Sequence, residues 1–192
     1  MGAKRLSEEL VLDTAARLAD AHGLDAVTVT KVAEELGVRQ PALYRYIDNY
    51  DGLVRSLSLR ARDQLTAAMA EAAVGLAGDE AVLAVAAAWR RFCHEHPGLY
   101  EATDRAPSTG DPEMEAAIEV VVEVIRRALT AFRLTDDAAV HAARSLRSAM
   151  HGFCHLELGR EYPSPVDLDD SYDQLVHLVI AGIGAMSVRS AA

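Results

Sequence analysis

The stretch TVTKVAEELGVRQPALYRYIDNYD, residues 28–51, decides how the N-terminal part of this chain folds. Its first half predicts a short helix, because either Thr28 or Thr30 can act as the N-cap. The apolar face of this helix consists of Val32, Ala33 and Leu36. Gly37 suits the left-handed conformation that commonly ends a helix, so the chain is expected to turn directly after it.

The second half of the stretch predicts another short helix with a polar surface. Pro41 suits its first turn, where a missing N–H costs nothing, and Leu43 and Ile47 lie four residues apart, facing the first helix. The other faces carry Arg39, Gln40, Tyr44, Arg45 and Tyr46. Such side chains can make bidentate contacts with base edges and hydrogen bonds with phosphates. We therefore expect a helix-turn-helix whose second helix enters the major groove of DNA.

The neighbouring residues extend this pattern from Leu10 to about Leu57. They include Ala15-Ala16-Arg17-Leu18, His22-Gly23, Val32-Ala33, Leu36-Gly37-Val38, Gln40-Pro41-Ala42-Leu43-Tyr44 and Leu53. At these positions the chain resembles the TetR family of bacterial transcriptional regulators. The resemblance implies a three-helix DNA-binding head with a phosphate-contacting tyrosine at Tyr44. The chain departs from the family at Tyr50, where a lysine usually contacts phosphate, so a contact here would carry no charge.

The residues expected to contact DNA come from both short helices, the turn between them and the residue that opens the next helix. They are Thr28, Thr30, Lys31, Arg39, Gln40, Pro41, Ala42, Tyr44, Arg45, Tyr46 and Tyr50. Residues 1–62 hold nine Lys or Arg and nine Asp or Glu, so the net charge of −10 lies entirely behind them. Because charges act over a Debye length of about 8 to 10 Å, the acidic remainder does not prevent DNA binding, although it should suppress nonspecific affinity.

The composition predicts an all-α fold. Hydrophobic residues make up 51% of the 192 residues and aromatic residues only 5%, and alanine-rich periodic segments with few β-branched runs favour helices. We expect about nine helices in a DNA-binding domain of residues 1–50 and a ligand-binding and dimerisation domain of residues 51–192. No apolar run of 18 residues and no signal peptide is evident, which predicts a cytoplasmic protein that does not bind membranes.

Capping and helix-breaking residues divide the rest of the chain. Asp51 is expected to cap a long helix that ends near Ala77, and Asp111 with Pro112 to begin a later helix that reaches Phe132. Thr135 is expected to cap the helix that follows. The helices expected after the head span about residues 51–77, 78–96, 99–101, 112–132, 136–159 and 171–188.

The last two of these helices carry seams of small residues. Ala138, Ala142, Ser145, Ala149 and Gly152 recur at alternating spacings of four and three, and His177, Ala181 and Gly184 form a shorter seam. Small residues let helix axes approach closely, although high helix propensity alone could also account for the alanines. An adjacent row already provides a core face, so a second apolar face indicates a second partner. That row is Ala139, Ala143, Leu146, Met150 and Phe153.

The resemblance implies that these two helices form a four-helix bundle between the subunits of a homodimer. Such a dimer would match a palindromic operator with half-sites about one helical turn apart. The residues expected at the subunit interface are Ala142, Ser145, Ala149, Gly152, Ala181 and Gly184.

Two further segments, residues 89–100 and 150–157, resemble the TetR subgroup whose C-terminal region is named for its Trp, His and Gly. We expect a pocket between the helix of residues 78–96 and the helix of residues 112–132, for a small, mostly apolar organic ligand with one or two hydrogen-bonding groups, because its walls combine apolar and a few polar side chains. The expected ligand-binding residues are Trp89, Cys93, His96, Tyr100, Ile118, Val121 and His151. An ordinary core role is the alternative for Trp89 and Tyr100.

Metal binding and catalysis are weaker interpretations. His151 and His155 lie four residues apart on one helix face, but no carboxylate completes an HExxH pattern, and Arg144 and Arg147 on the same stripe would repel a cation. Cys93 and Cys154 lack a CxxC partner and offer no zinc framework. The chain shows no nucleophile motif and no phosphate-binding loop, so we expect no metal, no cofactor and no enzymatic activity.

These patterns together predict a dimeric, ligand-responsive transcriptional regulator. We expect a repressor that a small molecule releases from a palindromic operator through a population shift. An activator of the same fold remains open, as does an interaction or enzyme module that keeps the helix-turn-helix as a scaffold.

Overall fold

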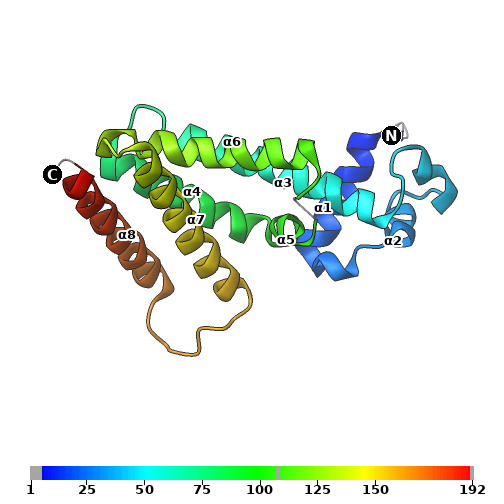
Figure 1. The fold of residues 1–192 in the computed structure, drawn as a ribbon. Helices are drawn as coiled ribbons and strands as arrows, with labels where there is room; N and C mark the ends of the chain where they lie inside the picture. The colour runs from blue at the N-terminus through cyan, green and yellow to red at the C-terminus, as the bar shows by residue number, and fades with distance from the viewer. Residues whose placement is uncertain (1–5, 107–108, 191–192) are drawn as a thin grey trace. The chain divides into compact units, whose positions relative to one another are not determined.

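The computed structural model describes residues 6–106 and 109–190, and it forms helices throughout (Figure 1). The α-helices are α1 (Glu8–His22), α2 (Val29–Glu35), α3 (Tyr50–Ala72), α4 (Gly78–Glu95), α5 (Pro97–Arg105), α6 (Pro112–Ala128), α7 (Asp136–Leu158) and α8 (Leu168–Ser190). The 3-10 helices are η1 (Leu24–Ala26), η2 (Gln40–Arg45) and η3 (Thr130–Phe132). The described residues contain no strand, so the all-α prediction is confirmed, with η2 as the ninth expected helix. None of these described helices is long and apolar enough to cross a bilayer.

Several helix boundaries differ from the expected ones, because residues of similar capping strength compete. The backbone N–H of Gly52 donates to Oδ1 of Asn49 at 2.8 Å, so Asn49 rather than Asp51 caps α3. Asp167 caps α8 by accepting from the N–H groups of Asp169 and Asp170, and this helix begins at Leu168, three residues before Ser171. Asp111 caps α6 as predicted.

Two helices end earlier than the sequence indicates, and one expected cap is absent. α3 ends at Ala72 rather than near Ala77, and α6 ends at Ala128. Phe132 belongs to η3, which is followed by Arg133 in a left-handed conformation at φ 52°. Thr135 stands directly before α7, but its side chain makes no capping hydrogen bond.

The chain divides into two compact units. Unit 1 consists of Met1–Asp63 and Glu95–Ala117, and unit 2 of Gln64–His94 and Ile118–Ala192. Unit 1 therefore includes α5 and the first turns of α6 in addition to the N-terminal helices. The functional division at residue 50 concerns DNA and ligand contacts and stays a prediction.

A close approach between α1 and α5 organises unit 1. A Cβ atom on Gly98 would lie 2.0 Å from the carbonyl oxygen of Ala19, so only glycine allows the two helices to come this near. Asp20 caps α5 from the neighbouring helix, because its Oδ1 accepts from the N–H of Leu99 at 2.8 Å. Its Oδ2 lies 3.1 Å from Nδ1 of His96. The start of α5 is thus fixed by a side chain of α1.

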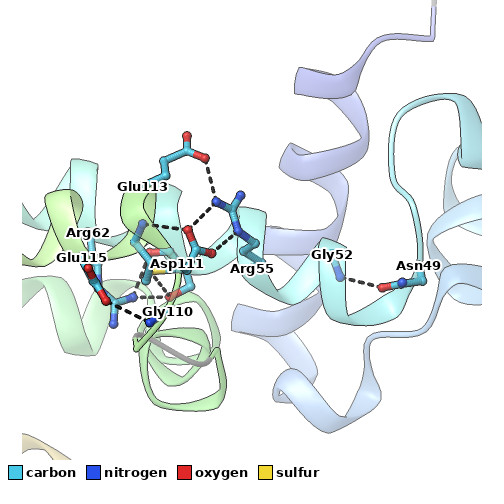
Figure 2. A network of polar contacts seen from close by, with 10 residues as sticks. Asn49, Gly52, Arg55, Arg62, Gly110, Asp111, Glu113 and Glu115 are labelled. Atoms are coloured by element: carbon cyan, nitrogen blue, oxygen red, sulfur yellow. Dashed lines mark hydrogen bonds and ion pairs between the residues drawn. The ribbon is translucent and has the colours of Figure 1, made fainter.

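Unit 1 also ties α3 to the start of α6 (Figure 2). The Arg55 guanidinium donates from Nη2 to Oδ1 of Asp111 at 2.9 Å and to Oε2 of Glu113 at 2.7 Å. The hydrogen bond from Arg55 lowers the pKa of Asp111 to about 2. Arg62, about two helical turns further and buried, donates to the carbonyl oxygen of Thr103 at 2.8 Å. The second half of unit 1 is therefore bound to α3 by two arginines.

Unit 2 packs α4 against α7 and α8, which lie side by side (Figure 1). Arg90 on α4 makes two hydrogen bonds to Glu157 on α7, at 2.9 and 2.6 Å, and pairs with Asp169 on α8 at 2.7 Å. Burial alone would raise the pKa of Glu157, but the bonds from Arg90 and His94 outweigh it and lower that pKa. Tyr172 donates its hydroxyl to the carbonyl oxygen of Ala86 at 2.8 Å. The three helices are therefore joined by one polar cluster, in which Glu157 and Tyr172 have little exposure and Asp169 is exposed.

The contact at Gly98 predicts a large difference between two Gly→Ala variants of unit 1. Gly98→Ala should lower stability by about 1 to 3 kcal/mol or more, because the backbone has to move to admit the methyl group. Gly52→Ala is the matched control: its Cβ would meet Asn49 Oδ1 at an ordinary 3.6 Å, and the substitution should stabilise α3 by about 0.5 to 1 kcal/mol. Thermal unfolding followed by circular dichroism measures both. Equal midpoints for the two variants would contradict the close approach.

Candidate nucleic-acid interface, subunit interface and ligand cavity

Local sequence accounts for the geometry of the helix-turn-helix. Thr28 Oγ1 accepts from the N–H of Lys31 at 3.1 Å, so Thr28, and not Thr30, is the cap of α2. Gly37 has the expected positive φ of 67°. Leu43 and Ile47 are buried, which seats η2 on the preceding helices. The predicted apolar anchors and the predicted turn are therefore present.

The eleven residues expected to contact DNA are accessible in unit 1. Exposed side chains belong to Thr28, Thr30, Lys31, Arg39, Pro41, Tyr44, Arg45 and Tyr50, and half-buried ones to Gln40, Ala42 and Tyr46. Tyr44 is 49% exposed. The segment Gln40–Arg45 thus presents polar groups to solvent, and Leu43 is the one buried residue of this segment.

The hydroxyl groups on this surface are already engaged. Thr30 Oγ1 donates to Oε1 of Gln40 at 3.2 Å, and Nε2 of Gln40 donates to the hydroxyl oxygen of Tyr44 at 2.9 Å. Tyr46 donates its hydroxyl to the backbone carbonyl of Leu6 at 3.0 Å. A direct contact between the Tyr46 hydroxyl and DNA therefore requires this bond to be exchanged. Sequence reasoning could not find these contacts, since they depend on how α2, η2 and the chain before α1 pack.

The surfaces of α7 and α8 differ from residue to residue along the predicted seam. Ser145 and Ala181 are exposed, and Ala149, Gly152 and Gly184 are half-buried. Ala142 is completely buried inside the protomer, so it offers no surface to a second subunit, which corrects its assignment to the interface. A Cβ atom on Gly152 or Gly184 would meet no atom within 4 Å. The seam is therefore open at its glycines.

An apolar hollow of about 560 Å³ lies between α7, α8 and the loop that joins them. Its lining residues are Ala149, Phe153, Tyr162, Val166, Asp170, Ser171, Gln174, Leu175 and Leu178. Leu178 is 71% exposed and Val166 is 64% exposed, more than folded chains usually leave to water in neighbouring apolar side chains.

A second hollow, of about 600 Å³, lies between α4 and the start of α8. Its lining residues are Leu83, Ala86, Ala87, Arg90, Arg91, His94, Glu157, Asp167, Leu168, Asp169, Tyr172, Asp173 and Val176. None of the seven residues expected to bind a ligand lines either of these two hollows. Sequence reasoning missed this one, because its walls come from three separate helices and its charged residues give no local signal.

The expected ligand-binding residues are divided between the two units. Trp89, Cys93 and Val121 are buried in unit 2, where Ile118 and His151 are half-buried. Tyr100 is buried in unit 1, and His96 is bound there to Asp20. The structure therefore places Trp89 and Tyr100 in the interiors of different units.

The histidines show no arrangement typical of a metal site. Within residues 6–106 and 109–190, no group of three His, Cys, Asp or Glu side chains is placed to hold a metal ion. The rings of His151 and His155 are stacked with their centroids 6.1 Å apart. His94 pairs with Glu157 at 3.0 Å. Each of these histidine contacts joins side chains of one unit.

Comparison with known proteins extends over nearly the whole chain. Residues 11–57 match the family described as bacterial regulatory proteins, tetR family, and residues 82–179 match the tetracyclin repressor-like, C-terminal domain. An uncharacterized HTH-type transcriptional regulator from Mycobacterium tuberculosis is 33% identical over 180 residues, which cover 93% of this chain and 82% of that protein. A second such regulator, from Bacillus subtilis, is 28% identical over 179 residues, 93% of each chain.

Solved structures show the same fold. BioQ from Mycobacterium smegmatis is 23% identical with a TM-score of 0.72, covering 94% of this chain and 99% of that chain. PfmR, a TetR family transcriptional regulator from Thermus thermophilus, is 20% identical with a TM-score of 0.66, covering 92% and 97%. The N-terminal helix-turn-helix, the C-terminal helices and the full-length relatives agree. The chain therefore belongs to the TetR family and is a DNA-binding transcriptional regulator.

Proposed function

We propose that this regulator binds a palindromic operator as a homodimer and represses transcription until a small, mostly apolar organic molecule releases it. The observation that carries the DNA-binding part is the surface of η2. Arg45, Tyr44 and Arg39 are exposed there while Leu43 and Ile47 fix the segment from below. An exposed, rigidly seated segment with Arg, Gln and Tyr matches what base and phosphate contacts require.

The proposed DNA-binding residues are the eleven accessible ones named above, within a functional domain of residues 1–50. Arg39 and Arg45 can form bidentate bonds with guanine, and Tyr44 can donate to a phosphate. Tyr50 opens α3 and is 37% exposed, so it can donate one neutral hydrogen bond. The remaining residues, 51–192, would then bind the ligand and the second subunit.

The proposed dimer uses the exposed faces of α7 and α8. Ser145, Ala149, Gly152, Ala181 and Gly184 allow close approach of helices from a second copy. The apolar hollow beside Leu178 and Val166 would be covered in the same contact. A two-fold dimer presents two recognition segments to half-sites that lie about 34 to 36 Å apart, one turn of DNA.

The proposed ligand acts by a population shift. It has to bind one arrangement of the protein more tightly than the other, since equal affinity for both shifts nothing. Two places in unit 2 are candidates: the buried surroundings of Trp89 predicted from the sequence, and the hollow between α4 and α8. The second has apolar walls at Leu83, Ala87 and Val176 and polar groups at Arg90 and His94, a combination suited to an organic molecule with hydrogen-bonding groups.

Two finer assignments accompany this proposal. The cytoplasm is the proposed location, because a bacterial operator lies there. The regulator is proposed to be neither an enzyme nor a metalloprotein, and the resemblance to the subgroup with the Trp-His-Gly region supports only a helical ligand-binding domain. An activator with the same fold would bind the same DNA, and a reporter gene behind the operator distinguishes the two by the sign of its response.

The missing phosphate-contacting lysine predicts a gain of function at position 50. Tyr50→Lys should raise affinity for all DNA and make the dependence of log K on log salt steeper by about 0.9 per subunit, because each new phosphate contact releases about one counterion. Fluorescence anisotropy over a series of salt concentrations measures the slope. Tyr50→Gln is the control, since it changes the side chain without adding charge and should leave the slope unchanged. If both variants share one slope, residue 50 does not face phosphate.

The open space around Gly152 predicts a specific loss of dimerisation. A Cβ atom at position 152 would meet no atom of its own protomer within 4 Å, so Gly152→Leu should keep helicity, whereas overpacking at the interface should weaken the dimer by about 1 to 3 kcal/mol or more per copy. Sedimentation velocity then shows monomers that bind the operator weakly. Gly152→Ala, which adds one methyl group, should have a much smaller effect. A Gly152→Leu dimer of unchanged affinity places the interface elsewhere.

The two candidate ligand places predict different responses to mutation. Small apolar compounds that raise the unfolding temperature are tested for release of the operator from the wild-type protein. Ala87→Trp should fill the hollow between α4 and α8 and abolish the response if the ligand binds there, while Trp89→Phe should leave it intact. The opposite pattern supports the place predicted from the sequence. Failure of every stabilising compound to release DNA argues against a ligand-responsive repressor.

A further inference from the structure

Three polar side chains form a continuous hydrogen-bonded relay on the proposed DNA surface. It begins at Thr30 on α2, passes through both ends of the Gln40 amide, and reaches Tyr44 one turn later on η2. All three lie in unit 1, and the two bonds measure 3.2 and 2.9 Å. The relay therefore connects a residue expected to read bases with one expected to contact phosphate.

In the structure both bonds run the same way along the relay. Thr30 donates to the amide oxygen of Gln40, and the amide nitrogen donates to the hydroxyl oxygen of Tyr44. A hydroxyl can donate or accept, so the same three groups could also bond in the reverse direction with the amide turned by 180°. The hydroxyl groups alone therefore do not choose between the two directions.

A phosphate oxygen chooses the direction, because it can only accept. Among the residues that the structure describes, no acceptor takes the Tyr44 hydroxyl proton in the observed direction, so the proton is available to a phosphate. Once Tyr44 donates to phosphate, its oxygen has to accept from the nitrogen of Gln40. The oxygen of Gln40 is then directed to Thr30, which has to donate. Neighbouring bonds of this kind also polarise and strengthen one another.

The fixed amide has consequences for base readout. Its oxygen keeps a second acceptor site and its nitrogen a second N–H, and this pair in this order matches the N6 amino group and N7 of adenine. The turned amide presents the donor where the acceptor was and loses that match. Immobilising Gln40 before DNA arrives also removes part of the entropy loss on binding.

We propose that Thr30 and Tyr44 set the base preference of Gln40, so that a backbone contact and a base contact act as one coupled unit. The inference replaces the direct DNA contact proposed above for Thr30: Thr30 is a positioning residue that acts through Gln40 and touches no base. The inference rests on the proposed placement of η2 in the major groove. It predicts that removing either hydroxyl erases discrimination at the base pair that Gln40 meets, and leaves the preference at other positions unchanged.

The test uses the full-length dimer and a randomised duplex library. Duplexes retained by the wild-type protein give a consensus, and anisotropy then compares the consensus with each single base-pair change at constant salt. Gln40→Ala identifies the pair that Gln40 reads by lowering discrimination there from about tenfold or more to less than about threefold. Thr30→Val and Tyr44→Phe should reduce discrimination between bases at the same base pair, and Tyr44→Phe should also weaken binding to every duplex.

A double-mutant cycle separates coupling from independent contacts. In the Gln40→Ala background, Thr30→Val should change affinity less than about twofold, because its effect acts through Gln40. Thr30→Ser keeps the hydroxyl and should restore the preference. Thr14→Val is the matched control, since it makes the same chemical change at a buried position of α1 in the same unit, where Thr14 Oγ1 donates to the carbonyl oxygen of Leu10 at 2.8 Å. It should leave the preference unaltered. Circular dichroism confirms that each variant is folded.

The outcomes distinguish failure of the relay from failure of the proposed interface. If Thr30→Val weakens all duplexes evenly, or if its effect multiplies with that of Gln40→Ala, Thr30 contacts DNA by itself and the inference is wrong. If the consensus is recovered and Thr30→Val leaves every preference intact, the relay alone is refuted. If Gln40→Ala changes no base preference, the placement of η2 in the groove fails together with the inference.

Discussion

The contact between Gly98 and the backbone of Ala19 is the constraint on which unit 1 depends. The first three helical segments of the chain offer few large apolar residues to one another, and α1 buries mainly Val11, Ala15 and Ala19. A face of small residues gains little from packing unless another helix comes very close, because dispersion falls quickly with distance. Glycine at position 98 allows this approach, and α5 completes the core that the N-terminal segment lacks.

Asp20 fixes the position of α5 along α1. Apolar contact alone would let α5 slide along α1, but a carboxylate that caps Leu99 and pairs with His96 fixes one register. The neighbouring contacts act in the same sense: Glu101 accepts from the N–H of Leu24 at 3.3 Å, and Arg105 pairs with Asp25 at 2.6 Å. Exposed pairs such as the last contribute little to stability. Their value is in orientation.

Unit 2 differs from unit 1 in that it holds a pair of charged side chains with little exposure to solvent. Glu157 has a side chain that is only 8% exposed, and Arg90 is 15% exposed. Such groups are tolerated only when both are bonded, and removing one partner of a buried pair typically costs about 3 to 5 kcal/mol. Arg90 also lies over the rings of Phe153 and Tyr172, at 5.8 and 5.1 Å from their centroids. Its role in joining three helices explains why the polar cluster sits in an otherwise apolar interior.

The sequence predicted what local chemistry controls. Gly37, Pro41 and Leu43 determine a turn, a helix start and an anchor within a few residues, and the helix-turn-helix follows from them. The cap of α3 was assigned to Asp51 because Asn and Asp cap almost equally well, so a shift of two residues leaves no signal. The role of Gly98 could not be predicted, because it depends on the carbonyl of Ala19, 79 positions earlier in the chain. The predicted ligand-binding residues line neither hollow for the same reason, because the walls of the hollows depend on packing between distant helices.

The division of the chain constrains how unit 2 can influence the DNA-binding residues. The chain passes from one unit to the other inside α3, at the end of α4 and inside α6. Bending a continuous helix disturbs its ladder of backbone hydrogen bonds. At the second passage α4 ends at Glu95, and His96, with φ −133° and ψ 57°, is not helical. Its carbonyl oxygen accepts from the N–H of Tyr100 at 2.8 Å, and its ring is held by Asp20. The junction of α4 and α5 is therefore the passage with a non-helical residue, and that residue is bonded both to α5 and to α1.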